Sequence, residues 1–243
     1  MNPAFNAKTV QKYVGVAQGD AVMTVEGTVN KTGLLLALLV IAAAWTWTLA
    51  LGPAGLDAAM PLMLGGLLGG LVFMLVTVFK KEWARVSAPA YAVCEGLFIG
   101  GLSAAMNTDF PGIVLQAVGL TFGVTATMLV LYRTGVIQVT QKFRTIVIAA
   151  TGGIALYYVA AIVLGFFHIT APLIWDTGTA GILLSLFVIV IAAMNLALDF
   201  DLIEKGSQAG VPKYFEWYAA FGVIVTLVWL YLEILRLLGK RRR

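Results

Sequence analysis

Four acidic side chains stand inside or at the ends of long apolar segments, at Glu95, Asp199, Asp201 and Glu233. Ionisable groups are expensive at membrane depth, so such residues are the first lead to function. Glu95 would lie about 10 Å from the nearer end of its segment if that segment is helical. Carboxylates are hard oxygen ligands of the kind that Ca²⁺ prefers, and they also bind protons. These residue types therefore indicate the handling of cations or protons.

A structural role stays open for each acid. Glu95 is equally well read as an uncharged side chain making one interhelical hydrogen bond. Asp199 and Asp201 are two residues apart, hence on nearly opposite helix faces, so at most one is expected to face the bundle while the other meets the headgroups. Both could also be the hydrated end of a helix. Glu233 precedes Arg236 by three residues, a spacing that favours a helical ion pair over a functional role.

The composition requires elements that lie in a bilayer. Of 243 residues, 60% are hydrophobic and 12% are charged, with a mean hydropathy of +0.94, whereas a soluble domain is nearer 45–50% apolar. About 20 apolar residues span a bilayer core as a helix. The sequence predicts an all-α seven-helix bundle with spans at Gly33–Gly52, Ala59–Phe79, Ala88–Met106, Pro111–Tyr132, Thr145–Phe167, Gly178–Leu198 and Tyr218–Leu238.

The domain organisation follows from these spans. We expect a polar cytoplasmic segment over residues 1–32, one transmembrane domain over 33–239 and a basic tail over 240–243. The first span is expected to serve as an uncleaved anchor, because no charged n-region precedes it.

Lysine and arginine alternate between the two sides of the predicted bundle. They occur in the N-terminal segment and in every second connection, whereas the other connections carry Asp57, Asp109 and Asp176. This positive-inside pattern predicts a cytoplasmic N-terminus. A full seventh crossing places the basic tail outside, against its charge. A re-entrant last segment is the alternative, but no proline interrupts it, so we expect a full crossing.

Small residues four apart recur in the second, third and fourth spans, and such spacing lets helix backbones approach closely. The pairs lie within Gly65–Gly70, at Gly96 and Gly100, and at Gly119 and Gly123. We expect them to pack against other helices of the same chain.

Enzymatic chemistry has little support. The single histidine, His168, and the single cysteine, Cys94, cannot build a common zinc site. Neither a Gly-x-Ser-x-Gly elbow nor a Walker loop occurs. We expect no enzyme activity, no cofactor, no stable metal and no nucleic-acid partner. The expected partners are the lipid bilayer, transient Ca²⁺ and other membrane proteins.

Three stretches resemble the bacterial branch of the Bax inhibitor (transmembrane Bax-inhibitor-motif) family. They are YAVCEGLFIGGLS at Tyr91–Ser103, FDLI at Phe200–Ile203 and YLEILRLLG at Tyr231–Gly239. The resemblance implies six helices around a central seventh and a pH-sensitive calcium leak. In the family, an aspartate ending the sixth helix shares a proton with an acid in the seventh.

Residue by residue, the resemblance assigns the first sensor position to Asp201. An ungapped match of the last helix assigns the second to Thr226, which is not an acid. Glu233 lies one heptad later on the same face, and Glu95 is the preferred second acid because its depth is closer to that of Thr226. Asp199 is a further candidate.

The sequence therefore predicts a cation leak channel, integral to a bacterial inner membrane. The alternative is a non-conducting scaffold that regulates membrane proteases or stress-response partners. Acids reached by water would favour the channel, and acids in dry packing would favour the scaffold.

Overall fold

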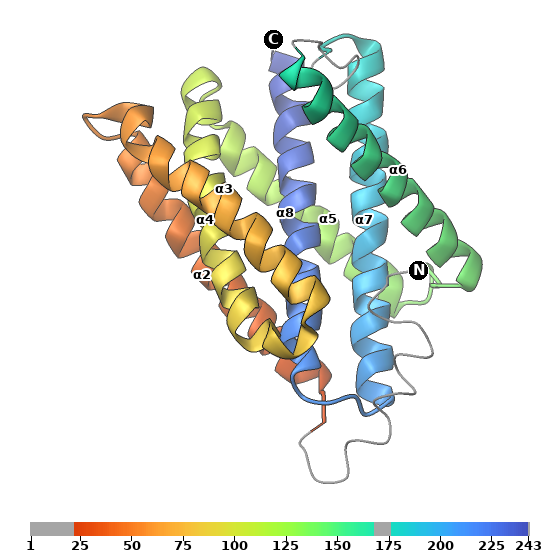
Figure 1. Cartoon of the computed structure of the whole chain (residues 1–243). Coiled ribbons are helices and arrows are strands. Elements are labelled where there is room, and N and C mark those ends of the chain that lie inside the picture. Colours follow the sequence, from red (N-terminus) through yellow and green to blue (C-terminus); the bar gives the residue numbers. More distant parts are fainter. Residues whose placement is uncertain (1–21, 168–175, 243) are drawn as a thin grey trace. The chain divides into compact units, whose positions relative to one another are not determined.

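A computed structural model describes residues 22–167 and 176–242 as seven long helices (Figure 1). The helices are α2 (Val25–Ala50), α3 (Gly55–Phe79), α4 (Ala84–Asp109), α5 (Ile113–Arg133), α6 (Gln141–Phe166), α7 (Thr179–Gln208) and α8 (Phe215–Arg242), with a short 3₁₀ helix, η1 (Lys81–Trp83), before α4. The all-helical prediction is confirmed. His168 and the part of the predicted N-terminal segment up to residue 21 lie outside the described residues.

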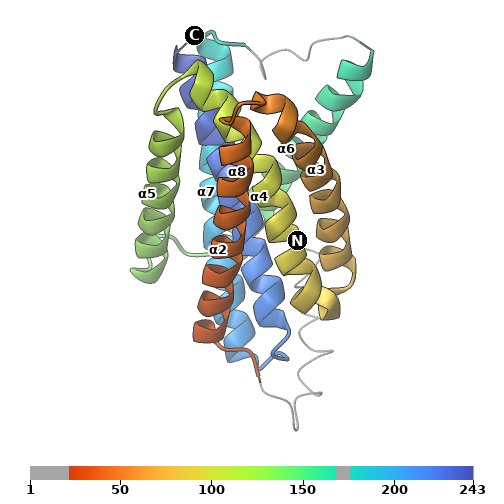
Figure 2. The same ribbon diagram turned by 90° about the vertical axis from the view of Figure 1, so that its left-hand side faces the viewer.

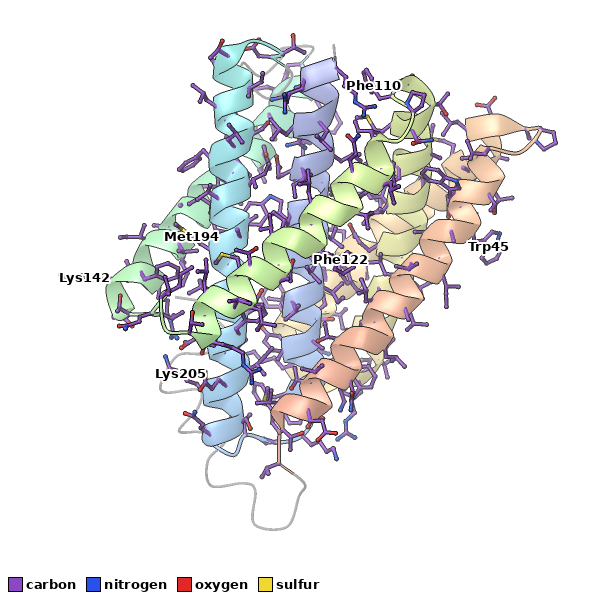
Figure 3. All side chains as sticks on the ribbon, turned by 180° about the vertical axis from the view of Figure 1, so that it is seen from behind. Trp45, Phe110, Phe122, Lys142, Met194 and Lys205 are labelled. Carbon is purple, nitrogen blue, oxygen red and sulfur yellow. The ribbon has the colours of Figure 1, made fainter. Side chains whose placement is uncertain are left out.

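Each helix is long and apolar enough to cross a bilayer. The shortest, α5, has 21 residues, or about 32 Å at the helical rise. Large apolar side chains point away from the protein, as they must where lipid is the solvent. Trp45 on α2 and Phe122 on α5 project from their helices in Figure 3 and are 62% and 49% exposed.

The observed helices extend beyond several predicted spans into polar sequence. α2 begins at Val25 rather than Gly33, since the Thr24 hydroxyl accepts from the Gly27 N–H at 3.0 Å. α7 continues through Gln208, past the predicted end at Leu198.

The chain divides into two compact units, and α7 and α8 run through both of them. Of the described residues, unit 1 comprises 112–167, 176–201 and 226–242, and unit 2 comprises 22–111 and 202–225. The described parts of each unit are treated separately below.

Unit 2 is organised around α4, which packs against both α2 and α3 (Figure 2). Glycines make these approaches close. A Cβ atom on Gly100 would lie 2.7 Å from the Ala43 Cα atom of α2, and one on Gly66 would lie 3.0 Å from the Phe98 backbone nitrogen of α4. The packing predicted for these glycines is confirmed.

The same prediction is wrong for Gly65, Gly119 and Gly123. In the described part of the chain, nothing lies within 4 Å of a Cβ atom built on any of them. Gly65 is adjacent to Gly66, and one step along a helix turns a side chain by about 100° away from the neighbouring helix.

Unit 1 has a core between α6, α7 and α8. Ile154, Val188 and Ile191 form a buried cluster, and Tyr158 and Trp229 pack against it. This cluster supplies the apolar surroundings in which the polar groups described below lie.

The last helix is the most buried of the seven candidate spans, as predicted for a central helix. In unit 2 its Phe221 ring meets the Tyr91 ring of α4 edge to face, with centroids 5.0 Å apart. In unit 1 its polar side chains bond to α6 and α7.

α8 is a single uninterrupted helix of 28 residues. In unit 1 it runs antiparallel to α7, because Thr226 bonds to Asp199 whereas Lys240 donates to the Gly181 carbonyl oxygen at 2.9 Å. This geometry supports a full crossing rather than the re-entrant alternative.

The contrast between adjacent glycines of α3 gives a matched test. We expect Gly66→Ala to lower stability by about 1–3 kcal/mol, since the added methyl group meets α4 backbone atoms. Gly65→Ala should be neutral or slightly stabilising, because alanine is the better helix former. Thermal unfolding in detergent measures both variants, and equal midpoints would contradict the observed α3–α4 approach.

Candidate functional site: a row of buried polar groups

Four of the five candidate residues lie in unit 1, and the fifth, Glu95, lies in unit 2. Asp199 and Asp201 belong to α7, whereas Thr226 and Glu233 belong to α8. All four are at most 9% exposed.

Asp199 is bound by Thr226, the residue that the family resemblance matches to the acid of the seventh helix. The Thr226 hydroxyl donates to Asp199 Oδ2 at 2.6 Å. Among the described residues, Asp199 forms no ion pair. A buried carboxylate with a neutral donor keeps an uncompensated charge unless a proton or a cation joins it.

Asp201 instead pairs with α6. Arg144 Nη2 donates to Asp201 Oδ2 at 2.5 Å, and the two side chains are 26% and 7% exposed. Arg144 lies in the first turn of α6. In the sequence it counts only as one of the basic residues that predict membrane orientation, and the ion pair is not predicted.

The expectation that at most one of the two aspartates faces protein is wrong. Asp199 is 9% exposed and Asp201 5%. They do point in different directions, but α7 has α8 on one side and α6 on the other, so both faces are covered. Nor do they close the helix, which continues through Gln208.

A second pair of groups joins α6 and α7 beside Asp199. Asn195 Nδ2 donates to the Thr151 hydroxyl and to the Ile191 carbonyl oxygen, each at 2.8 Å. Asn195 precedes Asp199 by one helical turn and therefore extends the polar face of α7.

The predicted ion pair of Glu233 and Arg236 is confirmed, with Arg236 Nη1 and Glu233 Oε1 at 2.8 Å. The sequence missed its third member, Tyr158 of α6. The Tyr158 hydroxyl donates to Glu233 Oε1 at 2.6 Å and accepts from Arg236 Nη1 at 2.8 Å. The adjacent Tyr157 and Tyr158 within this long apolar helix were the available signal.

These groups form a polar row along α8 in unit 1. Thr226 lies at one end, Glu233 and Arg236 follow, and Lys240 lies at the other end. Thr226 to Lys240 covers about 21 Å at 1.5 Å per residue, against a hydrocarbon core of about 30 Å. The row therefore covers much of the thickness of a bilayer.

Glu95 has a separate environment in unit 2. The Tyr91 hydroxyl donates to its carboxylate. A Cβ atom on Gly70 of α3 would lie 3.1 Å from Glu95 Oε2, so the absence of a side chain at Gly70 makes room for the acid. The pairing of Glu95 with Asp201 stays a prediction.

Glu216, which the sequence did not single out, is fully buried in unit 2 at the start of α8. Its Oε1 atom accepts from the Thr24 N–H at 2.9 Å and from the Thr24 hydroxyl at 3.1 Å, and its Oε2 atom pairs with Lys31. These bonds join the beginning of α2 to the beginning of α8.

The described residues contain no group of three or more His, Cys, Asp or Glu side chains that could hold a metal ion. Any cation bound by the row would have one or two carboxylates together with water and carbonyl oxygens.

Seven candidate spans and a buried polar row define an integral membrane protein. A family model described as Bax inhibitor 1 like matches residues 2–243. The chain belongs to this family, whose members are generally non-enzymatic membrane proteins. The family resemblance predicted from the sequence is thereby confirmed, while the assignment to the bacterial branch stays a prediction.

No curated protein and no solved structure matches the chain.

The Arg144–Asp201 pair can be tested by a double-mutant cycle. We expect Arg144→Gln alone to lower stability by about 3 kcal/mol, because it leaves a buried carboxylate without its counter-charge. Asp201→Asn should recover part of that loss in the double variant, with a coupling of about 1–3 kcal/mol. Detergent unfolding of the four proteins measures the coupling, and additive losses would refute the pair.

Proposed function

We propose that this protein is a pH-sensitive leak channel for cations, with Ca²⁺ as the main ion, and that Asp199 and Asp201 control the leak. The observation that carries the proposal is the Asp199 carboxylate, buried without an ion-pair partner among the described residues. Burying a carboxylate without a counter-charge is costly for a helix contact alone, whereas a carboxylate in a cation path attracts the ion.

The ligand chemistry supports weak and transient binding. Ca²⁺ takes six to eight oxygen ligands, and unit 1 offers a carboxylate and a hydroxyl at Asp199 and Thr226. Water and backbone carbonyls would complete the shell. Conduction requires a site that the ion can also leave, and a single acid meets that condition.

Arg144 supplies a means of closing the path. While its guanidinium group is bound to Asp201, that carboxylate is already neutralised by a cation of the protein. Ca²⁺ that displaces Arg144 would gain the Asp201 carboxylate on the α6 side of α7, as a second binding point distinct from Asp199 on the α8 side. Arg144 is partly exposed and can therefore be released towards water without carrying a charge through apolar packing.

The pH response follows from competition for the same oxygens. A proton on Asp199 or Asp201 removes the charge that attracts a cation, so acid should lower the leak and a rise in pH should increase it. Thr226 from α8 donates to Asp199, and Arg144 from α6 donates to Asp201.

Calcium flux in proteoliposomes tests the proposal. We expect the purified protein to release Ca²⁺ faster than empty vesicles do. Asp199→Asn should lower the rate about tenfold, equivalent to about 1.4 kcal/mol of lost cation binding. Asp201→Asn should flatten the pH dependence, because asparagine keeps the shape but cannot take up the proton.

Asp109→Asn is the matched control, because Asp109 is an exposed acid at the end of α4. It should leak as the unchanged protein does. Leak equal to that of empty vesicles at every pH would refute the channel and favour the scaffold that regulates proteases or stress-response partners.

We further propose that the start of α2 and the end of α7 face the cytoplasm across a bacterial inner membrane. In unit 2, Lys31 lies 5.4 Å from the centre of the Trp217 ring, and Lys81 the same distance from that of Tyr218. Lysine beside aromatic rings is typical of a membrane surface, and an excess of lysine is typical of its cytoplasmic side.

Reporter fusions test this orientation. An N-terminal fusion to a reporter active only in the cytoplasm should be active, and a C-terminal fusion should be silent, because α8 is one uninterrupted crossing. An active C-terminal fusion would overturn the assignment.

A further inference from the structure

The connection between α3 and α4 exposes basic and apolar side chains next to one another. Lys80 follows the end of α3, Arg85 lies in the first turn of α4, and both are exposed. Phe79, Trp83 and Val86 are 80%, 60% and 70% exposed. We call these five residues the η1 corner, after the 3₁₀ helix in this connection.

The η1 corner lies at a membrane surface, because it joins two helices that are each long and apolar enough to cross a bilayer. Phe79 directly precedes Lys80, and Val86 directly follows Arg85. At each end of η1 a cation is therefore next to an exposed apolar side chain. At a membrane surface, charged headgroups adjoin acyl chains, so both kinds of side chain find a partner in the same lipid molecule.

Two neighbouring lysines of this connection point towards different surroundings. Lys80 Nζ lies 5.4 Å from the centre of the Trp83 ring, and Lys81 Nζ lies at the same distance from that of Tyr218 in α8. Lys81 thus contacts another helix of unit 2, whereas Lys80 lies beside an exposed indole. A cation over an aromatic face is attracted to it, so Trp83 holds the Lys80 ammonium group at the exposed surface.

The η1 corner carries an excess of positive charge. Lys80, Lys81 and Arg85 stand in this connection, and Glu82 is the only acid of residues 58–94. In the described part of the chain, neither Lys80 nor Arg85 forms an ion pair, and Glu82 is exposed without one. An anion can therefore bind Lys80 and Arg85 without displacing a carboxylate of the protein.

The apolar half of the η1 corner distinguishes a lipid from other anions. Free phosphate contacts the cations only. A soluble acidic partner would have to reach Phe79 and Val86 at the edge of the hydrocarbon core. A phospholipid contacts both halves at once.

We propose that the η1 corner binds an anionic phospholipid. The Lys80 and Arg85 side chains bind its headgroup, and Phe79, Trp83 and Val86 contact its glycerol region and acyl chains. Basic residues near a membrane surface attract anionic lipids. A zwitterionic lipid such as phosphatidylcholine offers the same acyl chains but no net charge, so it binds less tightly.

Native mass spectrometry of the full chain in detergent tests the proposal, with phosphatidylglycerol as the anionic lipid and phosphatidylcholine as the zwitterionic one. We expect phosphatidylglycerol to bind more tightly than phosphatidylcholine. Lys80→Gln together with Arg85→Gln should weaken phosphatidylglycerol binding about 30-fold, since each basic residue near an anionic surface raises the affinity about fivefold. Phosphatidylcholine binding should change little.

Lys213→Gln is the matched control, because Lys213 is an exposed lysine of unit 2 and none of residues 202–242 is an exposed large apolar residue. It removes the same charge and should leave lipid binding unchanged. Phosphatidylglycerol binding that is equal in the unchanged protein and the double variant, or that Lys213→Gln lowers as much, would overturn the proposal. Displacement of the lipid by inorganic phosphate would also overturn it, since the cations alone would then account for binding.

Fluorescence in vesicles locates the bound lipid. The Trp83 contribution is the difference between the emission of the unchanged protein and that of Trp83→Phe. Phosphatidylglycerol brominated on its acyl chains should quench this contribution more than brominated phosphatidylcholine does. Lys80→Gln should reduce that difference, and Lys80→Arg should retain it. Equal quenching by the two lipids would overturn the proposal even if the double variant does not fold.

Discussion

Burial of carboxylates among apolar helices is the constraint on which the arrangement of unit 1 depends. A charge removed from water must be matched by a counter-charge, by hydrogen bonds or by a bound proton or cation. Asp201 has Arg144, and Glu233 has Arg236 and Tyr158. Asp199 has only the hydroxyl of Thr226 among the described residues. An acid whose charge is balanced by a nearby cation stabilises a contact between helices. An acid without such a cation is better suited to bind an ion from its surroundings.

The same constraint explains why α8 is central. A helix surrounded by lipid cannot carry Thr226, Glu233, Arg236 and Lys240 on one side without partners, since lipid offers neither donors nor acceptors. α6 and α7 supply these partners through Tyr158, Asp199 and the Gly181 carbonyl oxygen. Apolar packing around Trp229 and Ile191 fills the space between them. Polar bonding sets which faces meet, and apolar packing excludes lipid from the contact.

The sequence predicts the helices well, because hydropathy over about 20 residues decides whether a segment can lie in a bilayer. It also predicts local pairs such as Glu233 and Arg236, whose spacing on one helix is fixed. It does not predict Arg144 with Asp201 or Tyr158 with Glu233, because residues 57 and 75 positions apart meet only through tertiary packing. The expectation that only one of Asp199 and Asp201 faces the bundle is wrong for the same reason. The sequence of one helix shows which residues share a face, but not how many other helices pack against it. Hydropathy does not predict the start of α2, where the Thr24 cap extends the helix into polar sequence, or the end of α7, which continues through polar residues to Gln208.

The bond between Glu216 and Lys31 joins residues 185 positions apart, the first helix described and the last. During synthesis at roughly 5–20 residues per second, α2 is complete on the order of ten seconds or more before Glu216 exists. Until then the Lys31 ammonium group and the Thr24 N–H must be held by water or lipid headgroups at the membrane surface. Gly27 lies directly beneath the Glu216 carboxylate, so the late-arriving acid finds a position that no side chain has filled. The contacts of α2 in unit 2 are therefore completed only when the start of α8 has been synthesised. A nascent chain that stops before α8 lacks the carboxylate that binds Thr24 and Lys31.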